Sequence, residues 1–256
     1  MLSELVPSNL FVFIVVFARI GSALMLLPPF GDAFVFTRTK LVLALAVSAL
    51  ATPLAEPTLP VLPSGPLALA VILISEILVG LFIGGLARFL LSGLHTASMI
   101  VAYQTGLAAA LVFDPSAGQQ SVVIGRFFNL MALTLLFTTG LHHVLLMAVL
   151  DSYRLMPPGG LPEVGNFAGQ AVAFISGSFV IALQVASPVV VIGLLFYLAI
   201  GLVARLMPAM QVFFIALPLQ VMLGFWVTMV AMSATMLWYF DYIENGIGEL
   251  LTGSVL

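Results

Sequence analysis

Residues Gly106 to Gln120 read GLAAALVFDPSAGQQ, the least membrane-like stretch in the middle of a strongly apolar chain. Gly106 and the three alanines from Ala108 onward carry little side-chain bulk, so another backbone can approach them closely. Asp114-Pro115 then ends any helix, because the proline ring restricts the residue before it and removes a backbone donor. A non-helical backbone at membrane depth has to be buried in protein or line a water-filled cavity. We interpret this stretch as a loop that the surrounding helices hold; the alternative is an ordinary exposed loop between two helices.

The composition around this loop is typical of a membrane protein. Of the 256 residues, 62% are hydrophobic and 7% are charged, whereas soluble domains contain about a quarter charged residues. We therefore predict an all-α, integral membrane-type protein with a single domain of about six helical segments. The first residues, MLSELVPSN, contain no basic residue, so we expect no cleaved signal peptide.

Charge and cysteine content exclude several classes of function. The net charge is −3, and the sequence has no basic patch for a nucleic acid, so we expect no nucleic-acid partner. The absence of cysteine excludes disulfides, thiolate metal sites and cysteine nucleophiles.

Charged residues inside the apolar segments are the second notable feature. An arginine at the centre of a membrane helix costs about 2.5–3.5 kcal/mol on insertion scales, so such a residue should face a partner or water. Glu76 and Arg88 lie on different faces of one predicted helix, and we expect Glu76 to form a structural ion pair with Arg19 from another segment. The set of inward or assembly charges comprises Arg19, Glu76, Arg88, Arg126 and Arg205.

Proline and glycine interrupt the apolar segments, which predicts kinked helices and helical hairpins. Gly80 and Gly84 form a GxxxG pattern that allows another helix to approach closely. Gly140 predicts a helix end or kink. The apolar segments predicted in the first part of the chain are Leu10 to Pro29, Leu41 to Ala55, Leu67 to Leu91, Leu94 to Phe113 and Val122 to Tyr153.

The second part follows a proline- and glycine-rich connector, Leu155 to Phe167. Ala168 to Val203 is too long for one straight span, and Pro188 predicts either a kinked helix or a helical hairpin. In the last apolar run, from Gly201 to Met232, we expect Pro218 to break the helix. One face of that helix carries Met222, Met229, Met232 and Met236, which predicts core packing or, alternatively, a compliant seal around a passing chain.

No constellation of catalytic residues is present in the sequence. Adjacent His142 and His143 point to different faces of a regular helix, so they would not chelate one metal ion. Nucleophile–base spacings and cofactor loops are also missing. We predict no enzyme activity, no metal and no cofactor. The broken helices and inward charges leave a secondary transporter of a small solute as an alternative, although such chains normally contain more spans and a detectable repeat.

The chain resembles the FliR family of flagellar and type III secretion export-gate proteins over nearly its whole length. The motifs that carry the resemblance are ARIGSALMLLPPFG, EILVGLFIGG, QTGLAAALVFDP, TTGLHHVLLMAVLDSYRLMPPG and GLVARLMPAMQVFFIALPLQVMLG, in this order. Two positions depart from the family pattern. Ala209 stands where the family usually has glutamine, and Ala216 stands where it often has glycine.

The resemblance implies a fold of kinked, proline-broken helical hairpins that joins FliP and FliQ homologues in a closed spiral pore, largely above the lipid plane. Residues 1–256 would form one membrane domain, with a FliP-like part at about 1–160 and a FliQ-like part at about 161–256. Further implied partners are a FlhB homologue, the wider export apparatus and the unfolded flagellar proteins that it exports. The implied location is the bacterial inner membrane, within the flagellar basal body.

The resemblance also implies roles for individual residues. The loop from Gly106 to Gln120 is similar to the family's plug, which projects into the pore and closes it at rest. The inward charges would serve assembly contacts. The implied plug residues are Gly106, Leu107, Ala109, Leu111, Val112, Phe113, Asp114 and Pro115.

Overall fold

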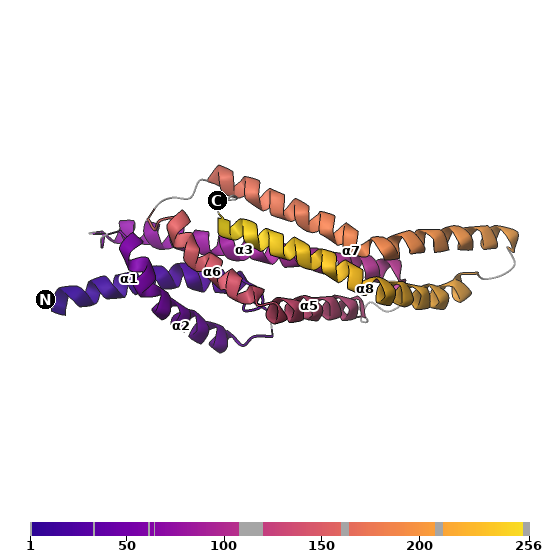
Figure 1. Cartoon of the computed structure of the whole chain (residues 1–256), viewed down its shortest axis with the longest axis horizontal. Helices are drawn as coiled ribbons and strands as arrows, with labels where there is room; N and C mark the ends of the chain where they lie inside the picture. Colours follow the sequence, from indigo (N-terminus) through magenta and orange to yellow (C-terminus); the bar gives the residue numbers. More distant parts are fainter. Residues whose placement is uncertain are drawn as a thin grey trace. The chain divides into compact units, whose positions relative to one another are not determined.

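The computed structural model describes residues 2–32, 34–60, 62–63, 65–107, 120–159, 164–207 and 212–252. Within these ranges the regular structure is helical and contains no strand, which confirms the predicted all-α class. The elements, in chain order, are α1 (Leu2–Leu26), α2 (Thr37–Ala55), the 3-10 helix η1 (Glu56–Thr58), α3 (Pro66–Gln104), α5 (Gln120–Thr138), α6 (Leu141–Leu155), α7 (Val164–Leu206) and α8 (Val212–Thr252) (Figure 1).

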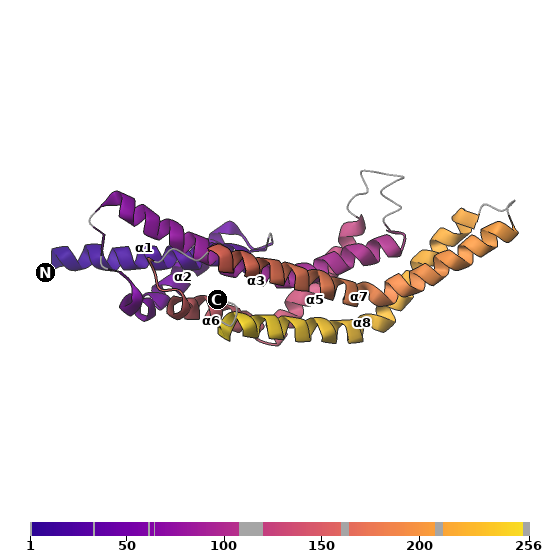
Figure 2. The same cartoon turned by 90° about the horizontal axis from the view of Figure 1, so that it is seen from above.

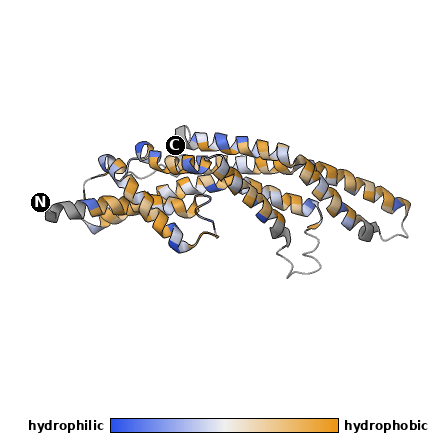
Figure 3. Cartoon of the chain, turned by 60° about the horizontal axis from the view of Figure 1, so that its bottom comes forward, coloured by the Kyte–Doolittle hydropathy of each residue, from blue (hydrophilic) through white to orange (hydrophobic). Residues whose placement is uncertain are grey.

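Five of the described helical segments are long and apolar enough to cross a membrane, and α5 with α6 would add a sixth as one bent span. Hydrophobic residues dominate the helices in Figure 3. This agrees with the prediction of a membrane protein of about six segments. The five segments are Asn9–Leu26, Thr37–Thr58, Pro66–Gln104, Phe167–Leu206 and Ala216–Glu249.

The helices group into two compact units, each assembled from separate stretches of the chain. Unit 1 comprises Met1–Leu90, Leu136–Ile175 and Glu244–Leu256. Unit 2 comprises Leu91–Leu135 and Ser176–Ile243. The long helices α3, α7 and α8 each contribute to both units.

Unit 1 is built around α1. Helices α1 and α2 lie against each other (Figure 2). The buried residues of α1 include Val16, Ile20 and Ala23, whose spacing of four and three places them on one helix face. A Cβ atom at Gly84 of α3 would lie 2.6 Å from the carbonyl oxygen of Ala23. Helices α1 and α3 therefore approach each other closely at the GxxxG pattern of α3, as predicted.

Helix α3 is a single helix of 39 residues, whereas separate segments ending at Leu91 and starting at Leu94 were predicted. Gly93 lies inside this helix, where a Cβ atom would be 2.9 Å from the carbonyl oxygen of Ser178 on α7. The glycine thus provides room for a neighbouring helix. The buried positions keep a spacing of three or four through the predicted break: Val79, Ile83, Leu86, Leu90, Leu94, Ala97 and Val101.

Prolines lie inside α7 and α8 without ending either helix. Pro188 has no N–H group, so the carbonyl of Gln184 loses its usual backbone donor. The hydroxyl of Ser187 donates to that carbonyl oxygen over 2.7 Å and replaces the missing donor. Of the two predicted forms, the hairpin is wrong, because α7 is one helix from Val164 to Leu206. The predicted break at Pro218 is wrong, because α8 begins at Val212 and runs through this residue in its second turn.

In unit 2, helices α7 and α8 run antiparallel. Tyr242 approaches Gly177, whose Cβ atom would lie 3.3 Å from the Tyr242 hydroxyl, and Tyr197 contacts Gln220. Residue numbers therefore rise along one helix as they fall along the other. The end of α3 and α5 complete the unit, with Ser98 of α3 against Gly125 of α5.

The methionine face of α8 is only partly core. Met236 is 7% exposed, whereas Met222 and Met229 are 71% and 72% exposed. Core packing, the favoured prediction, is confirmed for Met236 alone. The other two side chains remain available to another chain or to lipid.

Candidate functional site

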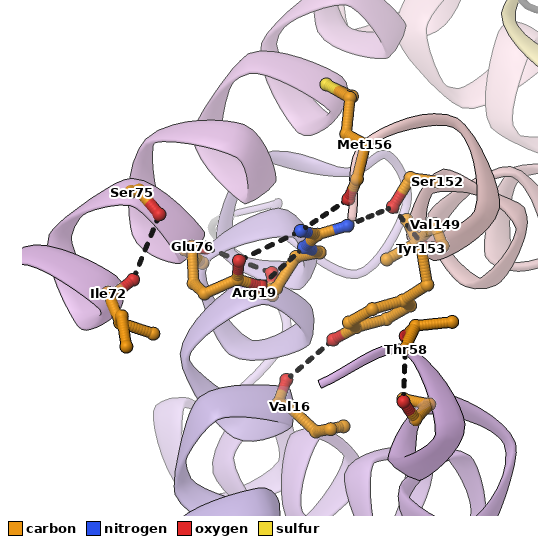
Figure 4. A network of polar contacts seen from close by, with 12 residues as sticks. Val16, Arg19, Thr58, Ile72, Ser75, Glu76, Val149, Ser152, Tyr153 and Met156 are labelled. Carbon is orange, nitrogen blue, oxygen red and sulfur yellow. Dashed lines mark hydrogen bonds and ion pairs between the residues drawn. The ribbon is translucent and has the colours of Figure 1, made fainter. Parts of the chain in front are cut away.

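Arg19 and Glu76 form a buried ion pair in unit 1, as predicted (Figure 4). The Arg19 Nε atom donates to Glu76 Oε2 over 2.7 Å, and Nη2 donates to Oε1 over 2.9 Å. This bidentate arrangement is the strongest form of an arginine–carboxylate contact. Both side chains are 1% exposed, so the charges neutralise each other away from water.

Helix α6 supplies the remaining partners of Arg19. Its guanidinium donates to the Ser152 hydroxyl over 3.2 Å and to the Met156 carbonyl oxygen over 3.0 Å. The Tyr153 ring lies 4.2 Å from the guanidinium carbon, and its hydroxyl donates to the Val16 carbonyl oxygen over 3.4 Å. The network thus ties together α1, α3 and α6, and nearly all donors of Arg19 are satisfied.

The other predicted inward charges, Arg88, Arg126 and Arg205, are exposed. Arg88 lies near Asp32, in the turn after α1. Burial raises the pKa of the Asp32 carboxyl above its ordinary value of 3.8, while Arg88 and Lys40 act to lower it. Arg126 and Arg205 lie on unit 2 helices, and their role in assembly remains a prediction.

The central loop starts where α3 ends. After Gln104 the chain turns through Thr105 and Gly106, and Gly106 has a φ of +77°, the left-handed region that favours glycine. Of the implied plug residues, Gly106 and Leu107 are described. Those outside the described residues are Ala109, Leu111, Val112, Phe113, Asp114 and Pro115.

Three helices meet at the loop base, by which we mean Gln104 to Leu107. On α8, Gln220 donates to the carbonyl oxygen of Gln104 over 2.8 Å and to the Tyr197 hydroxyl of α7 over 2.8 Å. A Cβ atom at Gly224 would lie 2.8 Å from the Cβ atom of Thr105. The small residue thus lets α8 pack directly on the turn. Gln220, a polar residue within an apolar run, was not among the predicted site residues.

An open apolar cavity of about 710 Å³ adjoins the loop base. Thr105 and Leu107 border it from the start of the loop, and aromatic residues of α5 and α8 cover much of its wall. Its lining comprises Thr105, Leu107, Ile124, Phe127, Phe128, Phe225, Thr228, Met229 and Met232.

The adjacent histidines His142 and His143 lie at the start of α6. Gly140 precedes α6 with a φ of 75°, which confirms the predicted helix end. In the first turn that follows, the rings of His142 and His143 lie with their centroids 4.0 Å apart. No cluster of three metal-binding side chains occurs in the ranges that the structure describes.

A comparison with known protein families identifies the family of this chain. The family model described as "Bacterial export proteins, family 1" matches residues 10–246. The chain belongs to this family. Its segments with the central loop and the motif around Arg205 therefore lie within one continuous family match.

Curated relatives of the family match at similar length. The flagellar biosynthetic protein FliR of Caulobacter vibrioides is 37% identical over 92% of this chain and 94% of its own length. FliR of Bacillus subtilis is 33% identical over 86% of both chains. The Yop proteins translocation protein T of Yersinia pestis is 26% identical over 86% of this chain and 85% of its own length. The chain is thus a FliR-family membrane component of a type III export apparatus.

Proposed function

We propose that this chain is a non-enzymatic subunit of the flagellar type III export gate in the bacterial inner membrane, within the basal body. With FliP and FliQ homologues it forms the channel through which unfolded flagellar proteins pass, and its central loop is the plug of that channel. A FlhB homologue and the wider export apparatus are further partners. The observation that carries the proposal is the match to flagellar FliR proteins over nearly the whole chain.

The lengths of the helices support an assembly rather than a set of simple spans. A membrane helix needs about 20 residues, whereas α3, α7 and α8 have 39, 43 and 41. Helices of this length extend well beyond a hydrocarbon core of about 30 Å unless they tilt strongly. This favours the family-implied position of the core largely above the lipid plane.

Apolar surface on the same helices supports the proposed partners. In the apolar 18-residue window of α7, only 11% of the residues are buried within the chain, and in that of α8 only 22%. Large exposed apolar surfaces indicate protein or membrane contacts. In the proposed gate, FliP and FliQ homologues cover part of this surface.

The loop base supports the plug role. Gly106 and Leu107 leave a well-packed meeting point of three helices, so the following residues start from a fixed place. A plug requires such an anchored base, because a segment that drifts would not close a pore. The remaining plug residues, with the Asp114-Pro115 break, follow within eight positions of Leu107.

The proposal is tested by deleting residues 108–117 from the full chain, co-expressed with its FliP and FliQ homologues. Ion leak through the purified complex is then measured in proteoliposomes and compared with the complex of the unchanged chain. We expect the deletion complex to assemble and to leak ions, while the unchanged complex stays closed. An assembled deletion complex that remains closed would refute the plug.

A further inference from the structure

We infer that Gln220 of α8 is the positioning residue for the central loop, because it fixes the end of α3 from which the loop starts. This inference rests on the proposed plug function of the loop. Gln220 lies within the last of the family-like motifs, but the sequence predicted no role for it. The contacts of its buried amide support the inference.

The carbonyl groups at the end of α3 need partners from outside the helix, because the last four carbonyls of a helix have no donor within it. The Gln104 carbonyl belongs to this group, and Gln220 Nε2 donates to it over 2.8 Å. Gln220 is only 8% exposed, so its amide has little access to water and depends on protein partners. The side chain thus acts as a cap that another helix provides.

The second hydrogen on Gln220 Nε2 also has a partner, because this nitrogen donates to the Tyr197 hydroxyl over 2.8 Å. An amide NH₂ group has two donors, and both are used, one toward α3 and one toward α7. The bonds therefore fix the amide in one orientation and connect three helices at one point.

The turn after α3 also packs against Gln220. A Cβ atom at Gly106 would lie 3.2 Å from the Gln220 amide carbon, so this side chain lies directly against the turn. One turn further along α8, Gly224 packs on Thr105, and residues four apart share a helix face. Gln220 and Gly224 therefore present one surface of α8 to the last residues before the loop.

The space around the two glutamine side chains is nearly filled. Atoms Cγ and Cδ of Gln104 would lie 2.7 and 2.8 Å from a Cβ atom at Gly193 of α7. The cavity that borders Gln104 and Gln220 holds about 10 Å³, no more than one water molecule needs. The loop base therefore has little freedom to move while the Gln220 bonds persist.

The experiment measures the mobility of the loop base directly. The chain has no cysteine, so Leu107→Cys provides a unique position for a spin label in the full-length protein. Spectra are compared between this background and the same background with Gln220→Leu, which keeps the size and removes both bonds. Gln184→Leu is the matched control, because Gln184 is an exposed glutamine of the same unit.

Gln220→Leu should increase the mobile fraction of the label, and Gln184→Leu should leave it unchanged. Loss of one neutral hydrogen bond shifts an equilibrium about five-fold, and loss of two shifts it up to about 30-fold. Tyr197→Phe removes only one bond and should give the smaller effect. It also serves as the test if Gln220→Leu fails to fold. An unchanged label spectrum in the folded variants would overturn the inference.

Ion leak through the assembled complex separates this inference from the proposed function. Gln220→Leu, without the label, should leak more than the unchanged complex. A mobile label without added leak, in a complex that does leak after deletion of residues 108–117, would overturn Gln220 as the residue that holds the plug. If the deletion itself causes no leak, the plug function fails instead. Label mobility then decides whether Gln220 positions the loop base.

Discussion

The Arg19–Glu76 pair illustrates how a charge is accommodated within apolar helices. An isolated buried charge costs several kcal/mol, whereas a bidentate pair with further donors and acceptors offsets most of that cost. The partners of Arg19 come from α3 and α6. The pair therefore selects one arrangement of three helices more than it adds net stability.

Removing one charge of the Arg19–Glu76 pair should cost more stability than removing both charges. Glu76→Gln leaves a buried guanidinium without its carboxylate, and we expect a loss of about 3–5 kcal/mol in the free energy of unfolding. Arg19→Met with Glu76→Met removes both charges and should lose less than either single change. Thermal unfolding of the purified chain in detergent measures all three. Equal stability of Glu76→Gln and the unchanged protein would contradict this account.

Asp32 makes stability depend on pH. One carboxylate oxygen of Asp32 is buried without a hydrogen bond, and burial raises its pKa above 3.8 despite Arg88 and Lys40. The folded chain thus holds this proton more tightly than the unfolded chain, so the ionised carboxylate lowers stability above the folded-state pKa. This cost shrinks as the pH falls through that pKa and is absent below about 3.8.

Asp32→Asn should therefore raise the melting temperature at neutral pH. The difference from the unchanged protein should decrease on acidification and disappear once both states are protonated. Melting curves of the two proteins across this pH range provide the measurement. A lower melting temperature of the Asn variant at neutral pH would mean that the two cations, rather than burial, dominate at Asp32.

Sequence reasoning reached the Arg19–Glu76 pair but not its other partners. A lone arginine in an apolar segment requires an opposite charge, and few carboxylates were available. Ser152, Tyr153 and the Met156 carbonyl lie more than 130 positions from Arg19, and neither a hydroxyl nor a backbone carbonyl signals such a contact in the sequence. Gln220 was missed for the same reason, because its partners are a backbone carbonyl and a hydroxyl on another helix.

At the scale of elements, the contact of α1 with α3 depends on glycine at specific positions. A Cβ atom at Gly84 would lie 2.6 Å from the Ala23 carbonyl oxygen, whereas one at the adjacent Gly85 would meet nothing within 4 Å. These two neighbours differ only in the helix face that they occupy. They provide a matched pair for testing the contact.

Gly84→Ala should destabilise the chain by about 1–3 kcal/mol, because α1 has to move away. Gly85→Ala should be neutral or gain up to about 1 kcal/mol, since alanine favours a helix over glycine. Chemical or thermal unfolding in detergent compares them. Equal effects of the two substitutions would show that close packing at Gly84 does not matter.

Helix boundaries were the least predictable part of the fold. We predicted separate segments on either side of Leu91, a kinked helix or hairpin at Pro188 and a break at Pro218, yet α3, α7 and α8 each continue through these positions as one helix. The reasons are tertiary or local: Gly93 accommodates a neighbouring helix, and Ser187 replaces the donor that Pro188 lacks. By contrast, Gly140 ends a helix as predicted, because its backbone adopts a conformation that few other residues tolerate.

At the scale of the whole molecule, the class was readable from composition, because a chain with 62% hydrophobic residues needs lipid or protein around it. The partition into two units was not predictable. Each unit combines stretches that are distant in sequence, and the sequence does not indicate which of the many apolar faces pack together. The exposed apolar surface of α7 and α8 needs lipid or other protein around it.

The most direct test of the proposed export-gate role is the mass of the purified particle. The tagged full-length chain is expressed with and without its FliP and FliQ homologues, purified in detergent, and weighed by native mass spectrometry or light scattering. We predict one large complex of defined mass that forms only with the partners. A stable monomer or small homo-oligomer that ignores those partners would contradict the export-gate role, and a secondary transporter of a small solute would then account better for the chain.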